Sequence, residues 1–543
     1  MIKCNLRALP GILIIASGAG VYITGLFVDQ TGDAAKYMAV ARSIVETGDW
    51  INLKIHHEPY IQKPPLLFWL TALAFHLGGV SVPVYKIPAL LVSVLGLYAT
   101  YRLGKLFYGS KTGKLAALML FFSQIFFLYN TDIHTDTLLV SFSVFSLWLF
   151  SCYLLNQNIL FLIGGFIATG LAMLTKGPVG LAIQVFAIGF HLIYTKNYRQ
   201  LFIWHWLLGV PILLFMLLPA FIGLYNQFGM DGLIFYFWTN NAGRITGSYI
   251  GNNNMDPFFY FHTMLYIFLP WSLFALSALF LEWKDIVAGR RDKTREALLI
   301  GGLSLFWIVL SVSRAKAPHY FFITLPFLAI LTAKWTLTIF RNTMYCKLRK
   351  IIVSSQVFII SGLWICAFII PACIFTNKSY LYLPILIIPI LLQLFLFKYK
   401  RGFALLLWTS FLAITAMNYS VNSVMLPGMF NYQSAIKASE KFNKEAASND
   451  ILYNFRYDQY EIFYYAKNSS MIDSDEKLNE VLTKDNVWIF TDCEGYHLIE
   501  SKTAIDTVFT FPHKNLTRPT LKFIWPSTRL SAVEKMYLLK ISG

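Results

Sequence analysis

The chain has 543 residues, of which 57% are hydrophobic and only 13% are charged. That is too little polar surface to coat a water-soluble globule of this size, so the composition excludes one and predicts a protein whose solvent is the bilayer. The net charge of +17 does not indicate nucleic-acid binding, because most Lys and Arg form short clusters between apolar runs, the pattern of cytoplasmic loops. These clusters are Arg102/Lys105/Lys111/Lys114, Arg290/Arg291/Lys293/Arg295, Lys347/Arg349/Lys350 and Lys398/Lys400/Arg401.

The first apolar run covers residues 9–28 and has no small-residue cleavage site before Asp29. We interpret it as a retained first span with a cytoplasmic N-terminus, not as a removed signal. An outer loop, residues 29–83, follows. In this loop, residues 33–47 have the spacing of an amphipathic helix, and the apolar run after Lys63 is too short to span. Both are predicted to be helices that lie at the membrane interface.

Apolar runs of about 17 to 25 residues can cross a bilayer as helices. Orienting these runs by their flanking Lys and Arg residues gives roughly thirteen spans. After the first, spans are predicted to begin near Val84, Leu115, Thr137, Ile159, Gly177, Phe202, His262, Ala297, Pro318, Ile351, Leu381 and Gly402. The outer turns are short except for residues 224–261. An odd number of spans places the end of the chain outside the cytoplasm.

The composition changes after the last span. Residues 425–543 carry mixed charges and short β-like runs, DILYNF, NVWIF and MYLLKIS. We therefore predict an all-α polytopic membrane domain, residues 1–424, and a small extracytoplasmic α/β domain, residues 425–543. The six cysteines show no CxxC spacing, so no disulfide framework is predicted.

Ionisable residues recur at the outer ends of several predicted spans. Because charges at membrane depth are costly unless they face a cavity and have partners, these residues are candidates for function. They are Asp33, Lys36, Lys63, Asp132, His134, Asp136, Lys176, Arg244, Arg314, Lys316 and His319. If the outer ends cluster, carboxylates would face several cations. Such a site suits a reaction in which cations neutralise a departing phosphate and a carboxylate orients or deprotonates the nucleophile.

Several segments carry a resemblance to a known family. DAAKYMAVARSIVETGDW followed by PYIQKPPLLFW resembles the first outer loop of the GT-C glycosyltransferases related to aminoarabinose transferases and protein mannosyltransferases. LTKGP, the FxW-to-Arg loop at 237–244, PFFYFHTMLYIFLPW at 257–271 and SRAKAPHYFFITLP at 313–326 are similar too, in the same order. The likeness covers roughly residues 10–340. The layout of spans with an outer C-terminal domain resembles the aminoarabinose transferase branch.

The resemblance implies roles for individual residues. Asp33 would be the catalytic aspartate of the first loop and Asp136 a second acidic residue near it. Lys63 and Arg244 would hold the donor phosphate, with Lys36, Lys176 and Lys316 as further cations around it. The cavity would be lined by Tyr37, Tyr60, Gln62, Trp238, His319 and Tyr320.

Two departures from the family pattern bear on metal binding. Ala34 and Gln62 stand where the aminoarabinose branch typically has Glu, and Asn240 and Asn241 stand where an acidic residue and a histidine are typical. The changes remove potential metal ligands, so we expect no required cofactor or divalent ion. They also leave open whether the sugar is aminoarabinose.

Each assignment has a structural alternative. Asp33 and Asp136 are also suited to cap the helices that begin beside them. Asp132, four residues earlier, is a competing candidate for the second acidic residue of the site, and the register of Asp136 before LLVSF favours Asp136. Lys63 is equally placed to snorkel to lipid headgroups. The other candidates have ordinary structural alternatives too. Arg244 fits an exposed arginine, Lys176 and Lys316 fit anchors at helix ends, and His319 and Tyr320 fit packing at the membrane interface.

Together these observations predict an inverting transferase of a bacterial inner membrane, with its site on the periplasmic side. It would move one sugar from a polyprenyl phosphate, such as undecaprenyl phosphate, to lipid A, another glycolipid, a polysaccharide or a protein. The alternative is a transporter or flippase of a lipid-linked anion, because cations inside a bundle also serve transport. Transporters usually show repeats and broken helices near mid-membrane, neither of which the sequence displays.

Overall fold

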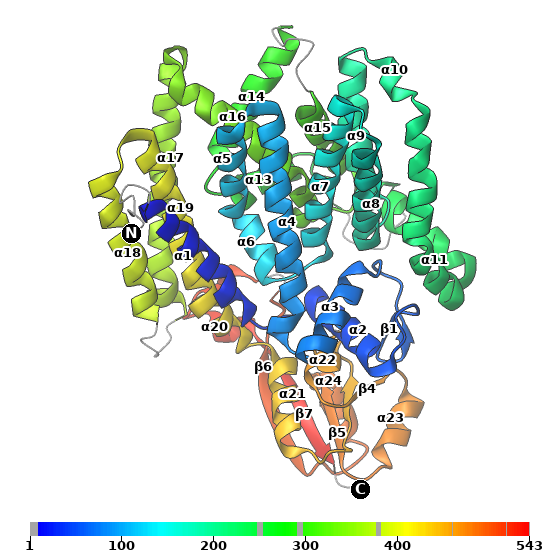
Figure 1. Ribbon diagram of the computed structural model, residues 1–543. Coiled ribbons are helices and arrows are strands. Elements are labelled where there is room, and N and C mark those ends of the chain that lie inside the picture. The colour runs from blue at the N-terminus through cyan, green and yellow to red at the C-terminus, as the bar shows by residue number, and fades with distance from the viewer. Residues whose placement is uncertain are drawn as a thin grey trace, which may run out of the picture.

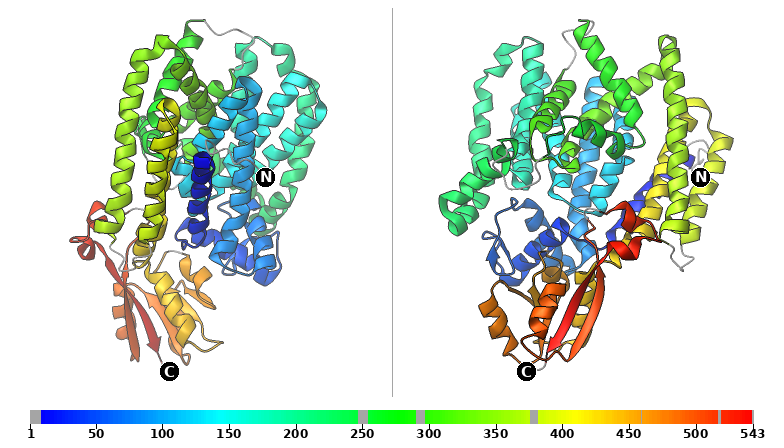
Figure 2. Two further views of the ribbon diagram at one scale, coloured as in Figure 1. Left: turned by 60° about the vertical axis from the view of Figure 1, so that its left-hand side comes forward. Right: turned by 180° about the vertical axis from the view of Figure 1, so that it is seen from behind.

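The computed structural model describes residues 9–246, 254–289, 297–375, 382–458, 460–516 and 519–541. A bundle of long helices forms most of the molecule, and a small sheet domain lies at one end of it (Figure 1). The outer-loop helices α2 (Asp33–Thr47) and α3 (Leu66–Gly78) lie between the two. Both further views show the same arrangement (Figure 2).

The bundle is built from apolar helices of very different length. Its main members are α1 (Leu9–Leu26), α4 (Val82–Tyr108), α5 (Ser110–Phe121), α6 (Gln124–Thr131), α7 (Thr135–Asn156), α8 (Ile159–Lys176), α9 (Val179–Tyr194), α11 (Gly209–Ile234), α14 (Ser272–Val287), α15 (Leu298–Val312), α16 (Leu325–Arg341), α17 (Cys346–Ile369), α18 (Tyr382–Tyr399) and α19 (Gly402–Ser420). Among the described residues, eight helices are long and apolar enough to cross a membrane, and a ninth span results if the pair α5 and α6, bent by 52°, is counted as one. The predicted multi-pass α-helical architecture is confirmed, whereas the number thirteen stays a prediction.

Two predicted segments differ from the structure. The span expected to begin near His262 is divided into α13 (Phe259–Ile267) and α14, because Pro270 in the connection has no N–H to continue a helix. The outer turn expected at 224–261 is helical for much of its length. There α11 continues past a kink at Gly229, where φ is +58°, into η2 (Phe235–Ala242) and α12 (Gly243–Thr246).

The outer loop is compact and contains the two helices that the sequence predicts. Helix α2 covers residues 33–47 and ends at Gly48, whose φ of +71° is readily adopted only by glycine. A short hairpin, β1 (Lys54–Ile55) and β2 (Glu58–Pro59), leads to α3. The side chains of Ala34, Ala35 and Met38 are fully buried. Helix α2 is therefore packed on several sides and is not a loosely attached surface helix.

The C-terminal domain, here called the tail, has a five-stranded mixed sheet in the order β4-β3-β5-β7-β6. The strands are β3 (Leu452–Phe455), β4 (Ser469–Ile472), β5 (Val487–Thr491), β6 (Thr507–His513) and β7 (Glu534–Ile541). Strand β3 pairs in parallel with β4 and β5, and β7 pairs antiparallel with β5 and β6. The three β-like runs of the sequence correspond to β3, β5 and β7.

Both faces of this sheet are covered because side chains along each strand alternate between them. On β5, Trp488 and Phe490 pack toward α21 (Ser434–Glu445), while Ile489 packs toward α23 (Asp475–Leu482) and α24 (Cys493–Glu500). The remaining tail helices are α22 (Glu461–Tyr465) and α25 (Leu521–Ile524). The fold class predicted for the tail is therefore confirmed.

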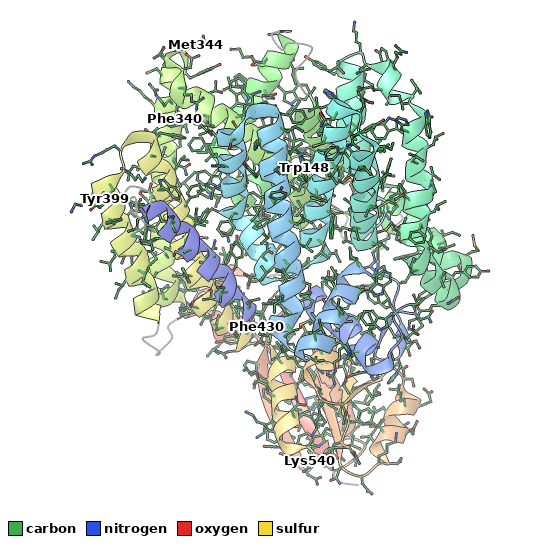
Figure 3. The ribbon with its side chains drawn as sticks, in the orientation of Figure 1. Trp148, Phe340, Met344, Tyr399, Phe430 and Lys540 are labelled. Atoms are coloured by element: carbon green, nitrogen blue, oxygen red, sulfur yellow. The ribbon has the colours of Figure 1, made fainter. Side chains whose placement is uncertain are left out.

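The tail follows the bundle through η6 (Val421–Met425) and α20 (Leu426–Phe430). Phe430 lies at the junction of bundle and tail, Lys540 lies in the tail, and Met344 lies at the opposite end of the bundle (Figure 3). Helix α17 begins two residues after Met344, so the basic cluster in its first turn lies far from the tail. This basic cluster and the tail therefore lie at opposite ends of the bundle.

Candidate active site

The outer loop contributes a carboxylate and a cation from the first turn of α2. Asp33 and Lys36 form an ion pair of 2.7 Å, and the Lys36 ammonium also donates to the Gln62 Oε1 atom over 2.8 Å. The N-cap of α2 is Gly32, and no side chain caps the helix from that position. Asp33 is therefore not the N-cap that its position allowed, and its carboxylate is directed to Lys36 instead.

The bundle contributes a second pair of the same kind. Asp136, in the first turn of α7, is buried and accepts a hydrogen bond of 2.5 Å from Lys176 at the end of α8. The Lys176 ammonium also lies 4.4 Å from the centre of the Tyr320 ring, within cation–π range. The N-cap of α7 is His134, without a side-chain cap. Asp136 and Lys176 thus bind each other and are neither a helix cap nor a surface anchor.

The end of α8 is shaped by the glycine of the TKGP motif. Gly177 has a φ of +77°, and a Cβ atom there would lie 3.3 Å from the Asn241 side-chain nitrogen. A residue with a side chain would be strained in this backbone conformation and would also press on Asn241. The glycine lets α8 end immediately after Lys176, which places that ammonium beside Asp136.

Between the two pairs lies an imidazole cluster. His134 contacts the Asp132 carboxylate over 3.2 Å. The His134 ring centre lies 5.3 Å from that of Tyr129, 5.7 Å from that of His319 and 6.1 Å from that of Tyr37. Of the two competing aspartates, Asp136 is buried and lines the main cavity, whereas Asp132 is half-exposed and pairs with His134.

Lys63 joins the outer-loop side of the site to the bundle side. Its charge acts on both the Asp33 and the Asp136 carboxylates. Burial alone would raise the pKa of Asp33, but the charges of Lys36, His134 and Lys63 hold that pKa well below its ordinary value. Burial would lower the pKa of His134, but Asp132 and the other nearby carboxylates raise it above its ordinary value. Asp33 is therefore held as an anion among cations.

The main cavity beside this cluster has one polar end and two apolar walls. Its volume is about 360 Å³. Its polar end is formed by Lys63, Asp136, Lys176, Asn240, Asn241 and Tyr320. One wall is a single face of α9 with Val179, Ala182 and Phe186, and the other is a single face of α15 with Phe306, Val309 and Leu310. Such a cavity suits an amphipathic ligand with an anionic head and a hydrocarbon tail.

Not every predicted site residue lies at this cavity. Lys316 is buried but donates to the Asn254 carbonyl over 2.8 Å and does not line the cavity. Trp238 lies on η2 with 61% of its surface exposed. The backbone of Arg244 belongs to α12, but its side chain lies outside the described part of the structure. The contribution of Arg244 to phosphate binding stays a prediction.

Apart from Trp238, the aromatic residues predicted around the site lie close to it. The Tyr37 and Tyr60 rings both pack on Phe68, with ring centres 5.7 and 5.5 Å from it. Tyr60 and Lys63 line a smaller cavity between the outer loop and α11. The His319 ring lies 4.6 Å from that of Tyr320. Within the described residues, no group of three or more His, Cys, Asp or Glu side chains is arranged to hold a metal ion.

Three further residues contribute to the site without having been predicted as part of it. Asn240 and Asn241 line the main cavity but were noted only as replacements of potential metal ligands. Tyr460, from the tail, places its ring centre 5.2 Å from the Lys36 ammonium. No pattern around Tyr460 indicates this contact, because it depends on how the tail docks onto the outer loop.

Comparison with known proteins places this geometry in context. Residues 62–222 match the dolichyl-phosphate-mannose-protein mannosyltransferase family. An uncharacterized protein from Aquifex aeolicus is 24% identical over 436 residues, which are 79% of this chain and 81% of that protein. The crystal structure of ArnT from Cupriavidus metallidurans bound to undecaprenyl phosphate has a TM-score of 0.73 at 15% identity, covering 98% of both chains. The chain has the fold of a GT-C glycosyltransferase. The likeness in fold that the sequence predicts is therefore confirmed.

The chain matches only part of the length of the relatives whose activity is stated. The undecaprenyl phosphate-alpha-4-amino-4-deoxy-L-arabinose arabinosyl transferase 1 of Pseudomonas fluorescens is 25% identical over 328 residues, 58% of this chain and 56% of the relative. The match thus spans little more than half of that enzyme. The fold is shared along 98% of the chain, whereas the sequence match to this enzyme covers 58% of it.

Proposed function

We propose that the chain transfers a sugar from a polyprenyl phosphate donor to an acceptor outside the cytoplasm. The observation that carries the proposal is the main cavity, in which cations at one end adjoin apolar walls from α9 and α15. A polyprenyl phosphate has the matching parts, an anionic phosphate and a long hydrocarbon chain. The likeness to ArnT bound to undecaprenyl phosphate supports a carrier of this chemical class.

In the proposed reaction, an oxygen of the acceptor attacks the anomeric carbon from the side opposite the phosphate. The bond from that carbon to the phosphate oxygen breaks, and polyprenyl phosphate leaves with the electron pair, so the configuration inverts. Lys63 stabilises the charge that develops on the leaving phosphate, and Lys176 contributes from the same end of the cavity. Arg244 is proposed as a further phosphate contact.

Asp33 orients the acceptor in this scheme. A carboxylate whose pKa is held below its ordinary value is a weak base, so its main contribution is to position the attacking group. When the acceptor is a hydroxyl, Asp33 takes its proton only late, as the new bond forms, and then releases it to water. Asp136 acts through Lys176, whose ammonium it holds at the polar end of the cavity. The Asn240 and Asn241 amides complete that end.

The proposed setting is a bacterial inner membrane, with the site and the tail on the periplasmic side. Residues 1–424, including the outer loop, form the catalytic domain, and residues 425–543 form the extracytoplasmic tail. The acceptor is lipid A, another glycolipid, a polysaccharide or a protein. The basic cluster at the start of α17, which lies at the end of the bundle away from the tail, supports this orientation.

The deciding experiment uses the purified full chain with synthetic undecaprenyl phosphate sugars and extracted envelope glycolipids, glycans and proteins. We expect stoichiometric release of undecaprenyl phosphate and a gain of one sugar mass on an acceptor. Acceptors and sugars are identified by mass spectrometry of envelopes from cells with and without the gene. Movement of the intact donor across proteoliposomes, without release of undecaprenyl phosphate, would instead establish the transporter alternative and refute the proposal.

A further inference from the structure

The helix that carries Asp33 begins at a backbone segment held from outside the bundle. Glu461 is the first residue of α22 in the tail and is fully buried. Its Oε1 atom accepts hydrogen bonds from the Thr31 hydroxyl over 2.5 Å and from the Gly32 amide over 2.8 Å. Thr31 and Glu461 are 430 positions apart in the chain. A carboxylate from the tail thus supplies the cap that Gly32 itself lacks.

A second contact from α22 fixes the residue before Thr31. The Tyr465 hydroxyl accepts from the Gln30 amide over 2.8 Å and donates to the Gln30 carbonyl over 3.1 Å. The Gln30 side chain in turn donates to the Thr131 carbonyl and accepts from the Ile133 amide, each over 3.1 Å. Gln30 therefore links the tail to the turn between α6 and α7, immediately before His134 and Asp136.

The opposite end of α22 is held just as firmly. Arg42, on α2, donates to the carbonyl oxygens of Tyr464, Ala466 and Lys467 over 2.7 to 2.8 Å. With Glu461 bound at the start of α2, both ends of α22 are attached to the outer loop, one at the start of α2 and the other at Arg42 in its second half. This double attachment restricts rotation and sliding of α2 relative to the tail.

The contact is costly to form, which argues against an incidental role. Burial raises the pKa of the Glu461 carboxyl, and only part of this effect is offset by the hydrogen bonds from Thr31, Gly32 and Tyr457. A hydrophobic side chain would pack here without that cost. It would leave the Gly32 amide at the start of α2 without this acceptor.

We propose that Glu461 is a positioning residue, which fixes the backbone of Thr31 and Gly32 and so sets where α2 presents Asp33 to the site. The consequence for catalysis rests on the proposed glycosyl transfer, whereas the effect on α2 does not. In this arrangement the tail is a structural part of the active site and not only a platform for acceptors.

The test compares three variants of the full chain in lipid nanodiscs. Glu461→Ala removes both acceptor oxygens, and Glu461→Gln keeps an oxygen for Thr31 and Gly32. Leu478→Ala is the matched control, because it leaves a cavity on the far face of the tail sheet without touching α22.

We expect kcat to fall about 10- to 100-fold in Glu461→Ala with little change in KM for the donor, since a misplacement on the order of 1 Å costs about 100-fold. Glu461→Gln should stay within about 3-fold of the wild type, because it retains the acceptor.

A second readout does not depend on the reaction. Amide hydrogen exchange of the peptide covering residues 30–36 should speed up in Glu461→Ala but stay slow in Glu461→Gln and Leu478→Ala. If Glu461→Ala does not fold, Thr31→Val tests the same contact from the other side. It removes one of the two hydrogen bonds to Glu461, so exchange should speed up in the same direction but by less. If the wild type transfers no sugar, the proposed function fails, while this exchange measurement still decides the positioning role.

Two results would overturn the inference. One is unchanged exchange over residues 30–36 in both Glu461→Ala and Thr31→Val. The other concerns Leu478→Ala and Glu461→Ala when both lose the same thermal stability. If kcat then falls equally in the two variants, a general weakening of the tail explains both losses.

Discussion

Lys176 donates a hydrogen bond to Asp136 over 2.5 Å, and both side chains line the polar end of the main cavity. The pair joins the last residue of α8 to the first turn of α7, and both side chains are largely buried. Its two charges compensate each other in a region of low dielectric, so removing one leaves the other without compensation.

Lys176→Met should therefore destabilise the protein strongly. We expect the free energy of unfolding to fall by about 3–5 kcal/mol, as for other buried pairs that lose one partner. The double variant Lys176→Met/Asp136→Leu should regain much of this loss, because no buried charge is left over. Thermal unfolding in detergent measures both. A double variant no more stable than Lys176→Met would show that the pair is not energetically coupled.

Asp33→Asn should reduce kcat about 100- to 10,000-fold, because the amide cannot replace the charge that orients the acceptor. Asp49→Asn, on the same outer loop, is the matched control. Asp49 accepts hydrogen bonds from the Ile51 and Asn52 amides, and an Asn side chain keeps that acceptor. Release of undecaprenyl phosphate measures both variants. Normal turnover by Asp33→Asn would remove Asp33 from the mechanism.

Lys63→Ala should lower kcat/KM for the donor about 10- to 100-fold, the loss expected for a hydrogen bond of about 1.5–3 kcal/mol to a charged phosphate. Lys63→Arg should lose less, since the positive charge remains. Lys54→Ala, in the nearby hairpin, removes a lysine that does not line the main cavity. Equal losses in Lys54→Ala and Lys63→Ala would point to a general change in surface charge.

The pH profile should report the cations around Asp33. Its lowered pKa means that Asp33 stays ionised below about pH 3.9, the ordinary midpoint for Asp. Its ion pair therefore contributes stability above that midpoint and is lost as pH falls through the lower folded-state pKa. Lys36→Met removes a lowering charge, so the acidic limb of the kcat/KM profile should move to higher pH. An acidic limb that stays in place would contradict the assignment.

Filling the apolar part of the cavity should discriminate between donors by the length of their chains. Ala182→Trp places a large ring on the wall formed by α9 and should raise KM for undecaprenyl donors more than KM for short-chain analogues. Val185→Trp is the control, because Val185 is 55% exposed and does not line the cavity. If both donors lose affinity equally in Ala182→Trp, the prenyl chain binds elsewhere.

Local patterns in the sequence determined much of the molecule. The amphipathic spacing of residues 33–47 matches α2, and the β-like runs of the tail match β3, β5 and β7. Both depend on contacts between residues close in the chain or on simple alternation of side chains. Composition alone was enough to require a membrane, because too few charged residues are available to cover a globule in water.

Only the tertiary structure decided which charges meet. Lys63 lies near both carboxylates, whereas Lys316, equally well placed in sequence, is bound to the Asn254 carbonyl. The Glu461 contact joins residues 430 positions apart, and neither its residue type nor its neighbours distinguish it from the other acidic residues of the tail. Helix periodicity fixes which face a side chain occupies but not which distant element packs against that face. Such long-range pairs are therefore set by the packing of the whole chain.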